Sequence, residues 1–303
     1  MKILIVGGGR MGLMRAGFLS AREACEVFLV EPDENTRSRF LQQVPNARPL
    51  SFIGEASAFG VDAAIICSPP ANHFDSALLC LKIGLPILLE KPSTLTREDS
   101  EVLALTAREK RVSISVGYHN RMRASVLKMK ELIMGTTVVG FTAWWTCGAY
   151  ARDWWHDPLL SGGALLEQAC HPVDLINFLV GPIVNCGGKV LHNLGAPETG
   201  AFWLQSSIGI GGTLFYSSEC PQKDIAVRVF TRTGTMHLDG WDLDLSIDGK
   251  RVGRGTKNSD RNEVFAHECT EFLKMVRTGA SNSRLATLEE AIATENIVRK
   301  LKI

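Results

Sequence analysis

The feature that most constrains this chain is a short apolar run that leads directly into three glycines. Residues 3–6 have the character of a buried strand, Gly7-Gly8-Gly9 follow, and a helix is expected over about residues 11–21. In the spacing Gly7-x-Gly9-x-x-Gly12, the first glycine permits a tight turn, the second lets the backbone approach a pyrophosphate, and the third lets the helix pack on the strand. The free N–H groups at the start of such a helix attract phosphate oxygens. The pattern therefore predicts a dinucleotide-binding site.

The predicted site has an acidic residue at the position that contacts a ribose. Glu31 follows the second strand-like run, residues 26–30, and comes 19 positions after Gly12, close to the spacing of a ribose-binding carboxylate. A carboxylate there accepts hydrogen bonds from the ribose diol and repels a 2′-phosphate, so NAD(H) is favoured over NADP(H). Arg37 and Arg39 are either exposed helix charges or cations that soften this preference, so NADP stays possible.

The first third of the chain alternates apolar strands with helices. Strands are expected at 26–30, 63–67, 86–90 and 112–116, with helices at 35–43, 73–83 and 94–110 between them. Apolar strands separated by helices form a parallel sheet that is covered on both faces. We therefore expect a doubly wound α/β domain of the Rossmann type over residues 1–118.

The pattern changes after residue 118. A helix at 124–134, a strand at 138–146 and a long helix at 163–180 precede successive short strands with turn signals from 184 to 247, and helices at 263–278 and 288–300 close the chain. Consecutive strands without intervening helices favour an antiparallel sheet. Residues 119–303 are therefore expected to form an α+β domain with an open, mainly antiparallel sheet. Because Pro172 donates no N–H, the long helix should kink there or restart just after His171.

Charge and cysteine content exclude several functional classes. The formal net charge is +1, so the chain has no global positive field to hold nucleic acid or an anionic membrane. No apolar stretch reaches the ~20 residues of a membrane span. The eight cysteines form no CxxC pair and no zinc-ligand spacing, so we expect no metal and reduced thiols. We expect a cytoplasmic protein that acts on a small molecule.

Four ordered landmarks carry a resemblance that spans nearly the whole chain. They are Pro69-Pro70-Ala71-Asn72-His73, Glu90-Lys91-Pro92, Gly117-Tyr118-His119-Asn120-Arg121, and the run from Asp157 through Gly162-Gly163 and His171 to Asp174. Together they resemble the glucose–fructose oxidoreductase/inositol dehydrogenase (Gfo/Idh/MocA) family of nicotinamide-dependent oxidoreductases. The resemblance implies a Rossmann domain followed by an α+β domain, whose open sheet commonly carries the oligomer interface on its outer face.

The resemblance also implies catalytic roles. The lysine of the Glu-Lys-Pro motif lies beside the nicotinamide and the substrate oxygen, and the later motif supplies an acid–base histidine. Carried over by position, these residues are Lys91, His171 and, for the acid four residues before the histidine, Glu167. The chain departs from the family in having Glu167 for the usual Asp, Pro70 for a common Asn and Ala164 for a glycine.

These residue types suit alcohol oxidation on elementary grounds. Histidine titrates near neutral pH and can accept the proton of a carbinol. A lysine ammonium stabilises the developing alkoxide. On a helix, Glu167, His171 and Asp174 would share one face, where a carboxylate would orient the imidazole.

The remaining candidates divide between cofactor and substrate. The predicted cofactor-binding residues are Gly7, Gly9, Arg10, Met11, Gly12, Glu31, Ser68, Pro69, His73, Glu90 and Lys91. The predicted substrate-binding residues are Tyr118, His119, Trp155, His156 and Asp174. Each has a structural alternative: His73 as a helix-start residue, Asp174 as an internal hydrogen-bond partner, and the tryptophans of segment 147–161 as anchors that pin a surface loop.

The leading functional hypothesis is hydride transfer between NAD(H) and a carbinol or carbonyl carbon of a sugar, polyol or sugar derivative. Two alternatives are an NAD(P)H-dependent reductase of a C=N or C=C bond in a planar metabolite, and a binding protein that senses the cofactor without turnover. Apolar residues at Phe202, Leu204 and Phe215 predict a homodimer or homotetramer joined through the sheet of the second domain.

Overall fold

A computed structural model describes residues 1–192, 198–253, 255 and 261–302 of the chain. The chain divides into two compact units. The first comprises Met1–Gly117 and Phe265–Glu289, and the second comprises Tyr118–Val264 and Glu290–Ile303. The sequence prediction placed all of 119–303 in the second domain, whereas the segment Phe265–Glu289 packs with the first unit.

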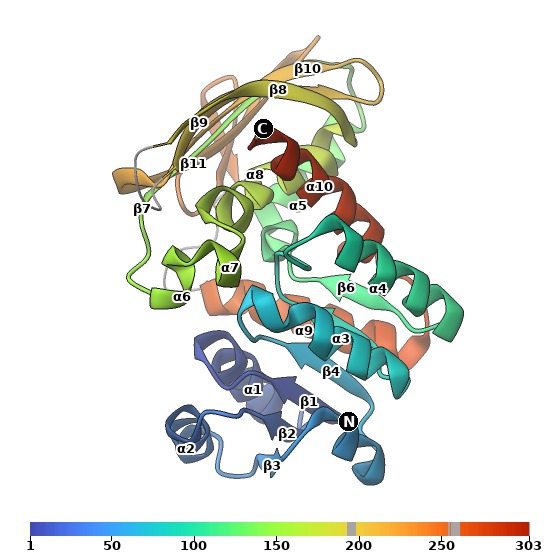
Figure 1. Ribbon diagram of the computed structural model, residues 1–303. Helices are drawn as coiled ribbons and strands as arrows, with labels where there is room; N and C mark the ends of the chain where they lie inside the picture. The colour runs from blue at the N-terminus through green and yellow to red at the C-terminus, as the bar shows by residue number, and fades with distance from the viewer. Residues whose placement is uncertain (193–197, 254, 256–260, 303) are drawn as a thin grey trace. The chain divides into compact units, whose positions relative to one another are not determined.

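The first unit is built on a seven-stranded sheet (Figure 1). Its strand order is β15-β6-β5-β4-β1-β2-β3, and every neighbouring pair is parallel except β15 with β6. The strands are β1 (Lys2–Val6), β2 (Glu26–Val30), β3 (Arg48–Leu50), β4 (Ala63–Ile66), β5 (Ile87–Leu89), β6 (Ile114–Val116) and β15 (Ala286–Thr287). The predicted Rossmann-type sheet is confirmed. The chain leaves β1 in one direction for β2 and β3 and returns on the other side of β1 with β4, which creates the switch point where such sheets bind ligands.

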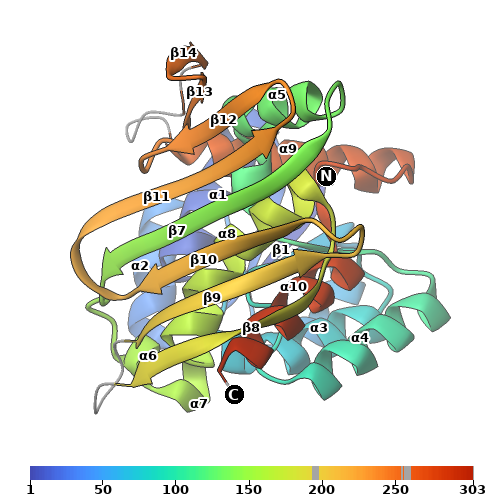
Figure 2. The same ribbon diagram turned by 90° about the horizontal axis from the view of Figure 1, so that it is seen from above.

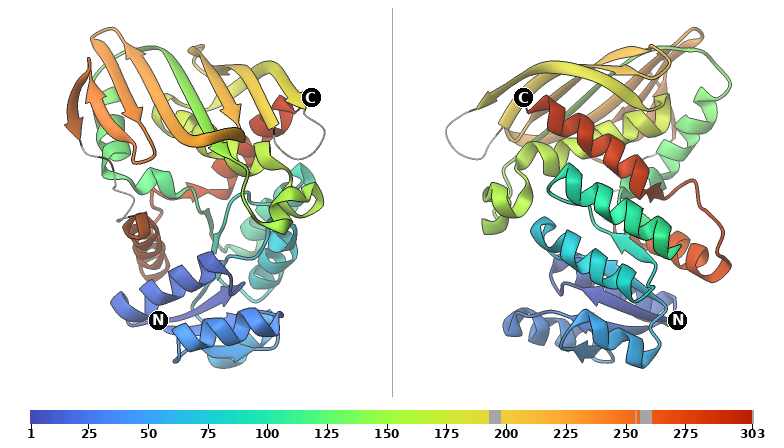
Figure 3. Two further views of the ribbon diagram at one scale, coloured as in Figure 1. Left: turned by 90° about the vertical axis from the view of Figure 1, so that its left-hand side faces the viewer. Right: turned by 45° about the vertical axis from the view of Figure 1, so that its right-hand side comes forward.

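Helices cover both faces of this sheet. They are α1 (Arg10–Arg22), α2 (Glu34–Gln43), α3 (His73–Lys82), α4 (Arg97–Lys110) and α9 (Arg261–Thr278), with 3-10 turns η1 (Ile53–Phe59) and η2 (Pro70–Asn72). Figures 1 and 3 show α3 and α4 on one face and α1 and α9 on the other. Because both faces are covered, the central strands carry apolar side chains throughout, as in β4 and β5, which are wholly buried.

The second unit is built on an eight-stranded sheet with the order β14-β13-β12-β11-β7-β10-β9-β8. The strands are β7 (Val138–Gly148), β8 (Ile183–His192), β9 (Glu198–Ser206), β10 (Gly211–Ser217), β11 (Glu219–Thr231), β12 (Gly234–Asp239), β13 (Asp244–Ile247) and β14 (Lys250–Gly253). All pairings are antiparallel except that of β7 with β10. The predicted, mainly antiparallel sheet is confirmed.

One face of this sheet packs on helices α5 (Ala124–Ile133), α8 (Ala164–Val180) and α10 (Leu288–Leu301), which Figure 2 shows behind it. Among the described residues, no helix covers the opposite face. Along β9, buried Phe202 and Leu204 therefore alternate with exposed Ala201, Trp203 and Gln205. The prediction that Phe202 and Leu204 lie on an open interface face is wrong, because both point toward the helices.

The remaining helical turns of the second unit are short. They are α6 (Asp153–His156), α7 (Pro158–Ser161) and the 3-10 turn η3 (His119–Met122). Helix α8 continues through Pro172, so the predicted restart after His171 does not occur. Its almost complete burial beneath the sheet stabilises the helix despite the hydrogen bond that proline removes. No helix in the described part of the chain is long and apolar enough to span a membrane.

Candidate active site

The glycine turn lies at the carboxyl end of β1, at the switch point of the first sheet. Gly7 has a φ of +96°, and a Cβ there would lie 2.6 Å from the backbone nitrogen of Ser68. A Cβ on Gly12 would collide with the carbonyl oxygen of Gly7, so helix and strand pack together only without side chains. At Gly9 a Cβ would meet nothing within 4 Å. This open space beside the N-terminus of α1 fits the approach of a pyrophosphate.

Residues at the start of α1 line this opening. Gly9 is the N-terminal flanking residue of the helix, and no side chain caps the helix there. Arg10 is exposed and Met11 is half-buried in the first turn. The unpaired N–H groups and the nearby guanidinium together favour an anion at this end.

Glu31 is held beside the glycine turn by two backbone hydrogen bonds. Its Oε2 accepts from the N–H of Gly8 at 2.7 Å, and its Oε1 accepts from the N–H of Asp33 at 2.9 Å. Each oxygen has a further lone pair for a ribose hydroxyl. Arg37 donates through Nη1 to the carbonyl oxygens of Glu31 and Pro32 at 2.9 and 3.3 Å. One nitrogen of that guanidinium is therefore engaged with the main chain.

The Glu90-Lys91-Pro92 segment follows β5 at the same edge of the sheet. Lys91 is half-buried, and the peptide bond between Lys91 and Pro92 is cis. Glu90 is buried, and its carboxylate accepts through Oε1 from Nε and Nη2 of Arg15 on α1, at 2.9 and 2.6 Å. Glu90, which the sequence assigned to the cofactor, thus binds a buried cation inside the unit.

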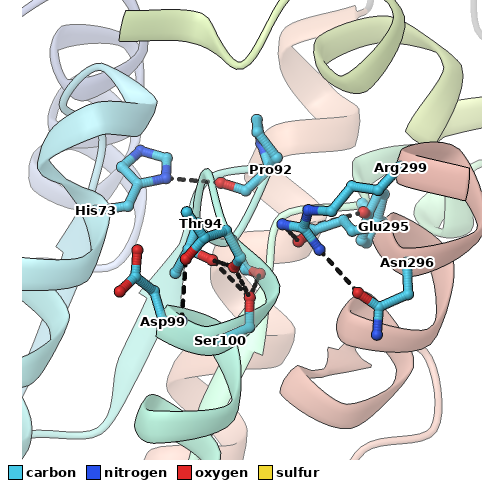
Figure 4. A network of polar contacts seen from close by, with 11 residues as sticks. His73, Pro92, Thr94, Asp99, Ser100, Glu295, Asn296 and Arg299 are labelled. Atoms are coloured by element: carbon cyan, nitrogen blue, oxygen red, sulfur yellow. Dashed lines mark hydrogen bonds and ion pairs between the residues drawn. The ribbon is translucent and has the colours of Figure 1, made fainter. Parts of the chain in front are cut away.

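His73 links two of the predicted cofactor loops. Its Nδ1 lies 2.8 Å from the carbonyl oxygen of Pro92, as Figure 4 shows, and its Nε2 lies 2.8 Å from the carbonyl oxygen of Ser68. Burial lowers the pKa of His73, while the two carbonyls oppose that shift. The ring joins the loop after β4, which carries half-buried Ser68 and Pro69, to the loop that carries Lys91. Its structural role as a helix-start residue is the one that the contacts support.

A cluster of hydroxyl groups fixes the far end of the Lys91 loop. Thr94 Oγ1 donates to the carbonyl oxygen of Thr96 at 2.6 Å and lies 2.5 Å from Ser100 Oγ on α4 (Figure 4). The Oγ1 of Thr96 in turn accepts from the N–H of Asp99 at 3.1 Å, which caps α4. The loop around Lys91 is therefore anchored to several elements of the first unit.

His171 lies in the second unit within a group of aromatic rings. Its imidazole is stacked on Trp145, with centroids 5.1 Å apart and an interplanar angle of 11°. His119 and Tyr118 meet it edge-on, at 5.2 and 6.3 Å. His171 is 6% exposed and His119 8%. The rings hold the imidazole in one orientation on α8.

Glu167, one turn before His171 on α8, is tied to Trp155. The indole Nε1 of Trp155 donates to Glu167 Oε2 at 3.0 Å, and the two residues are 1% and 7% exposed. The expectation that Trp155 offers its face to substrate is corrected, since the ring is buried and anchors α6 to the helix. His156 is exposed and meets the Trp155 ring edge-on at 5.1 Å.

Asp174 and Tyr118 are engaged inside the second unit. Both carboxylate oxygens of Asp174, which is 1% exposed, accept from Arg121, the closest contact being 2.6 Å to Nη2. The hydroxyl of buried Tyr118 donates to Glu295 at 3.3 Å. Burial raises the pKa of Asp174, although Arg121 opposes the shift. The contacts therefore support the structural alternative for Asp174, and the polar groups of both residues have partners inside the unit.

Two features were not predicted from sequence. The first is Arg15, the buried partner of Glu90. The second is Lys223, whose ammonium lies 4.7 Å from the ring centre of Trp241 and 5.3 Å from that of Tyr150. Trp241 in turn meets Trp145 edge-on at 5.6 Å. No sequence signal identified these residues, because a cation in a helix or a strand normally faces solvent.

Two family models match the chain. The first describes the oxidoreductase family Gfo/Idh/MocA with its NAD-binding Rossmann fold and matches residues 1–118. The second describes the Gfo/Idh/MocA C-terminal domain and matches residues 132–237. The first match covers the residues predicted for the Rossmann domain, and the second lies within those predicted for the α+β domain.

Individual relatives agree with these matches. The chain is 23% identical to myo-inositol 2-dehydrogenase of Thermotoga maritima, over 92% of this chain and 89% of that protein. It is 25% identical to scyllo-inositol 2-dehydrogenase (NAD(+)) of Bacillus subtilis, over 59% of this chain and 55% of that protein. The fold is similar to that of GenD2 from gentamicin A biosynthesis, solved in complex with NAD, with a TM-score of 0.85, 23% identity, and coverage of 99% of this chain and 93% of that one. The chain is an NAD-dependent oxidoreductase of the Gfo/Idh/MocA family.

Proposed function

We propose that the protein is a dehydrogenase that transfers a hydride between NAD(H) and a carbinol or carbonyl carbon of a polyol, a sugar or a sugar derivative. The observation that carries this proposal is the imidazole of His171, oriented by Trp145 and placed one helical turn from the Glu167 carboxylate. The inositol dehydrogenase relatives support the polyol class. They favour it over reduction of a C=N or C=C bond and over a cofactor sensor.

In this mechanism each residue has one task. The cofactor, when bound, accepts or returns the hydride. His171 takes the hydroxyl proton of the substrate as the carbinol is oxidised and returns it in the reverse direction. The ammonium of Lys91 stabilises the negative charge that develops on the substrate oxygen. Glu167 lies one turn before His171 on α8, and the indole N–H of Trp155 holds its carboxylate in place.

The residues that would hold the cofactor lie on the first unit. Gly7, Gly9 and Gly12, with the start of α1, would bind the pyrophosphate, and Glu31 would accept from the ribose diol. Among the predicted substrate-binding residues, His119 and His156 stay the candidates for contact with the substrate. His119 lies against His171, and His156 is exposed.

A panel of substrates tests the proposal. Purified protein is mixed with NAD and, in separate wells, myo-inositol, scyllo-inositol, glucose, a hexuronic acid and a nucleotide sugar, and the absorbance of the reduced nicotinamide is followed. Turnover of at least one polyol or sugar is expected. NAD binding without turnover of any of them would overturn the proposal.

We further propose that the protein is a homodimer or homotetramer joined through the uncovered face of the second sheet. That face exposes large apolar side chains, with Trp203 48%, Phe215 43% and Leu191 57% exposed. Trp203 is paired with Thr213, and Phe215 with Trp144 on β7, so the rings lie on adjacent strands of one face. Apolar groups gathered in this way favour burial against a second copy. Light scattering should give a dimer or tetramer, and a monomer at micromolar concentration would refute the assignment.

We also propose a cytoplasmic location. All eight cysteines are free thiols, and five of them are buried, as is usual for proteins of a reducing compartment. Cell fractionation should recover the protein with soluble cytoplasmic enzymes.

A further inference from the structure

Arg15 is a fully buried cation that joins three elements of the first unit. It lies on α1, its side chain is 0% exposed, and its guanidinium is flanked by two carboxylates. Nε and Nη2 donate to Glu90 Oε1 at 2.9 and 2.6 Å, and Nη2 also donates to Glu268 Oε2 at 2.7 Å. The third nitrogen, Nη1, donates to Cys269 Sγ at 3.3 Å. A single side chain on the glycine-turn helix thus binds both α9 and the residue before Lys91.

The surrounding chain is shaped to fit this guanidinium. A Cβ on Gly117, which follows β6, would lie 3.2 Å from Glu90 Oε2 and 3.3 Å from Arg15 Nη2. The side chains of Arg15 and Glu268 are 0% and 1% exposed, and that of Glu90 is 11% exposed. The aromatic ring of Phe265 also packs against the guanidinium, and its centre lies 5.6 Å from Arg15 Cζ. Because these side chains are so deeply buried, Arg15 and Glu90 have little room for another rotamer.

The neighbours of Arg15 favour its charged form. Burial by itself would lower the pKa of Arg15, but Glu90, Cys269 and Glu268 raise it well above its usual value. Such a buried pair contributes little net stability compared with apolar residues of the same size, because desolvation of both charges offsets their attraction. The pair does supply a fixed geometry, since the planar guanidinium donates hydrogen bonds to carboxylates in few arrangements. Stability alone therefore does not account for this arrangement.

Glu90 directly precedes Lys91, so the fixed contact between Arg15 and Glu90 bears on the proposed catalytic lysine. Lys91 is flanked by Glu90, which Arg15 holds, and by Pro92, whose carbonyl oxygen His73 contacts at 2.8 Å. The backbone N–H of Glu90 donates to the carbonyl oxygen of Ile66 at 3.0 Å. Lys91 itself is half-buried. Arg15 and His73 both hold residues next to Lys91. Of the two, Arg15 lies on α1, the helix that begins at the glycine turn.

We propose that Arg15 is a positioning residue for the reaction: through Glu90 it fixes the backbone at Lys91 relative to the glycine turn at the start of α1. This inference rests on the proposed role of Lys91. Glu268 balances the charge of Arg15 from the other side but does not adjoin the loop. The two carboxylates therefore provide a matched pair of variants, because each contacts the same nitrogen of the same guanidinium and only one is next to Lys91.

Hydrogen–deuterium exchange tests the positioning directly and without a substrate. Three variants are compared with wild type at a temperature where all are folded: R15K, E90Q and E268Q. R15K and E90Q should accelerate exchange at the amides of Lys91, Ser93 and Thr94, while E268Q should leave them unchanged. Equal exchange in all three variants would overturn the proposal. Should R15K fail to fold, E90Q still removes the charge from the same contact.

Kinetics then test the consequence. With the best substrate of the panel, R15K and E90Q should lower kcat roughly ten- to a hundredfold, since small displacements of a catalytic group are costly, and the NAD Kd should stay within about twofold. E268Q should lose thermal stability but keep kcat within about twofold. The primary deuterium isotope effect on kcat should rise in R15K and E90Q only, because the chemical step becomes slower. If kcat falls equally in E268Q, Arg15 is merely structural. If wild type turns over no substrate, the proposed function fails, while the exchange result still decides whether Arg15 fixes the loop.

Discussion

Trp155 donates its indole N–H to Glu167 at 3.0 Å, and both side chains are buried. This contact joins α6 to the helix that carries His171, one turn further on. An aromatic residue in a polar segment suggested a ligand-stacking face, but the ring is used to hold a carboxylate.

Replacing Trp155 by Phe should therefore destabilise the protein rather than weaken substrate binding. The variant replaces the indole by a smaller aromatic ring and leaves a buried carboxylate without this donor, and loss of the donor costs about 1–3 kcal/mol. Thermal unfolding measures the loss. His156→Ala, which alters the exposed neighbour, should leave the melting temperature unchanged. An unaltered melting temperature in W155F, with a raised KM, would restore Trp155 to the substrate site.

The buried ion pair of Asp174 and Arg121 should contribute to the stability of the fold. D174N leaves the Arg121 guanidinium without its buried counter-charge and should cost about 3–5 kcal/mol of unfolding free energy. Glu290, which contacts the same guanidinium at 2.7 Å, has a side chain that is 52% exposed. E290Q should therefore cost about 1 kcal/mol or less. Chemical denaturation of the two variants measures both values, and equal losses would contradict the assignment.

Glu31 should set the preference between the two nicotinamide cofactors. Its carboxylate is fixed at the glycine turn by the N–H groups of Gly8 and Asp33, so a 2′-phosphate would meet a fixed negative charge. E31S should lower the ratio of the NADP Kd to the NAD Kd by roughly tenfold, equivalent to about 1.4 kcal/mol. E34S, an exposed carboxylate in the first turn of α2, is the control and should leave the ratio unchanged. Wild-type protein that binds NADPH as tightly as NADH would contradict this role.

Cys269 should be inert in the folded protein and should report on the Arg15 cluster. Burial raises its pKa to about 11, so at pH 8 only about one thiol in a thousand is ionised, and the thiolate is the reactive form. Mass spectrometry after brief iodoacetamide treatment should find Cys269 unmodified in native wild type and modified after denaturation. Rapid labelling of Cys269 in the native protein would show that the cluster is open to solvent.

The local patterns of the sequence predicted the geometry of the glycine turn. The roles of Gly7, Gly9 and Gly12 depend on short-range geometry, and the space around each of them matches its predicted use. The short strands β3 and β15 were missed because runs of three and two residues carry no periodicity. Lys91, His171 and Glu167 were identified from motifs, and their chemical roles stay predictions.

Long-range packing accounts for the features that were not predicted. The helical part of the segment Phe265–Glu289 reads as an ordinary amphipathic helix. Its place in the first unit depends on long-range contacts, such as that of Glu268 with Arg15 and the pairing of β15 with β6. The inward direction of Phe202 and Leu204 depends on the register of β9 with β10, which a shift of one residue would invert. The helix persists through Pro172 because burial of α8 outweighs one missing hydrogen bond.

The most direct test of the central claim is the rate of hydride transfer in Lys91 and His171 variants. Single-turnover reduction of NAD by the best substrate of the panel is measured for wild type, K91M and H171A, together with the NAD Kd of each. The account predicts that both variants bind NAD within about threefold of wild type and lose roughly a hundredfold or more in rate. Either variant retaining the wild-type rate would contradict the assignment of Lys91 and His171 to the chemical step.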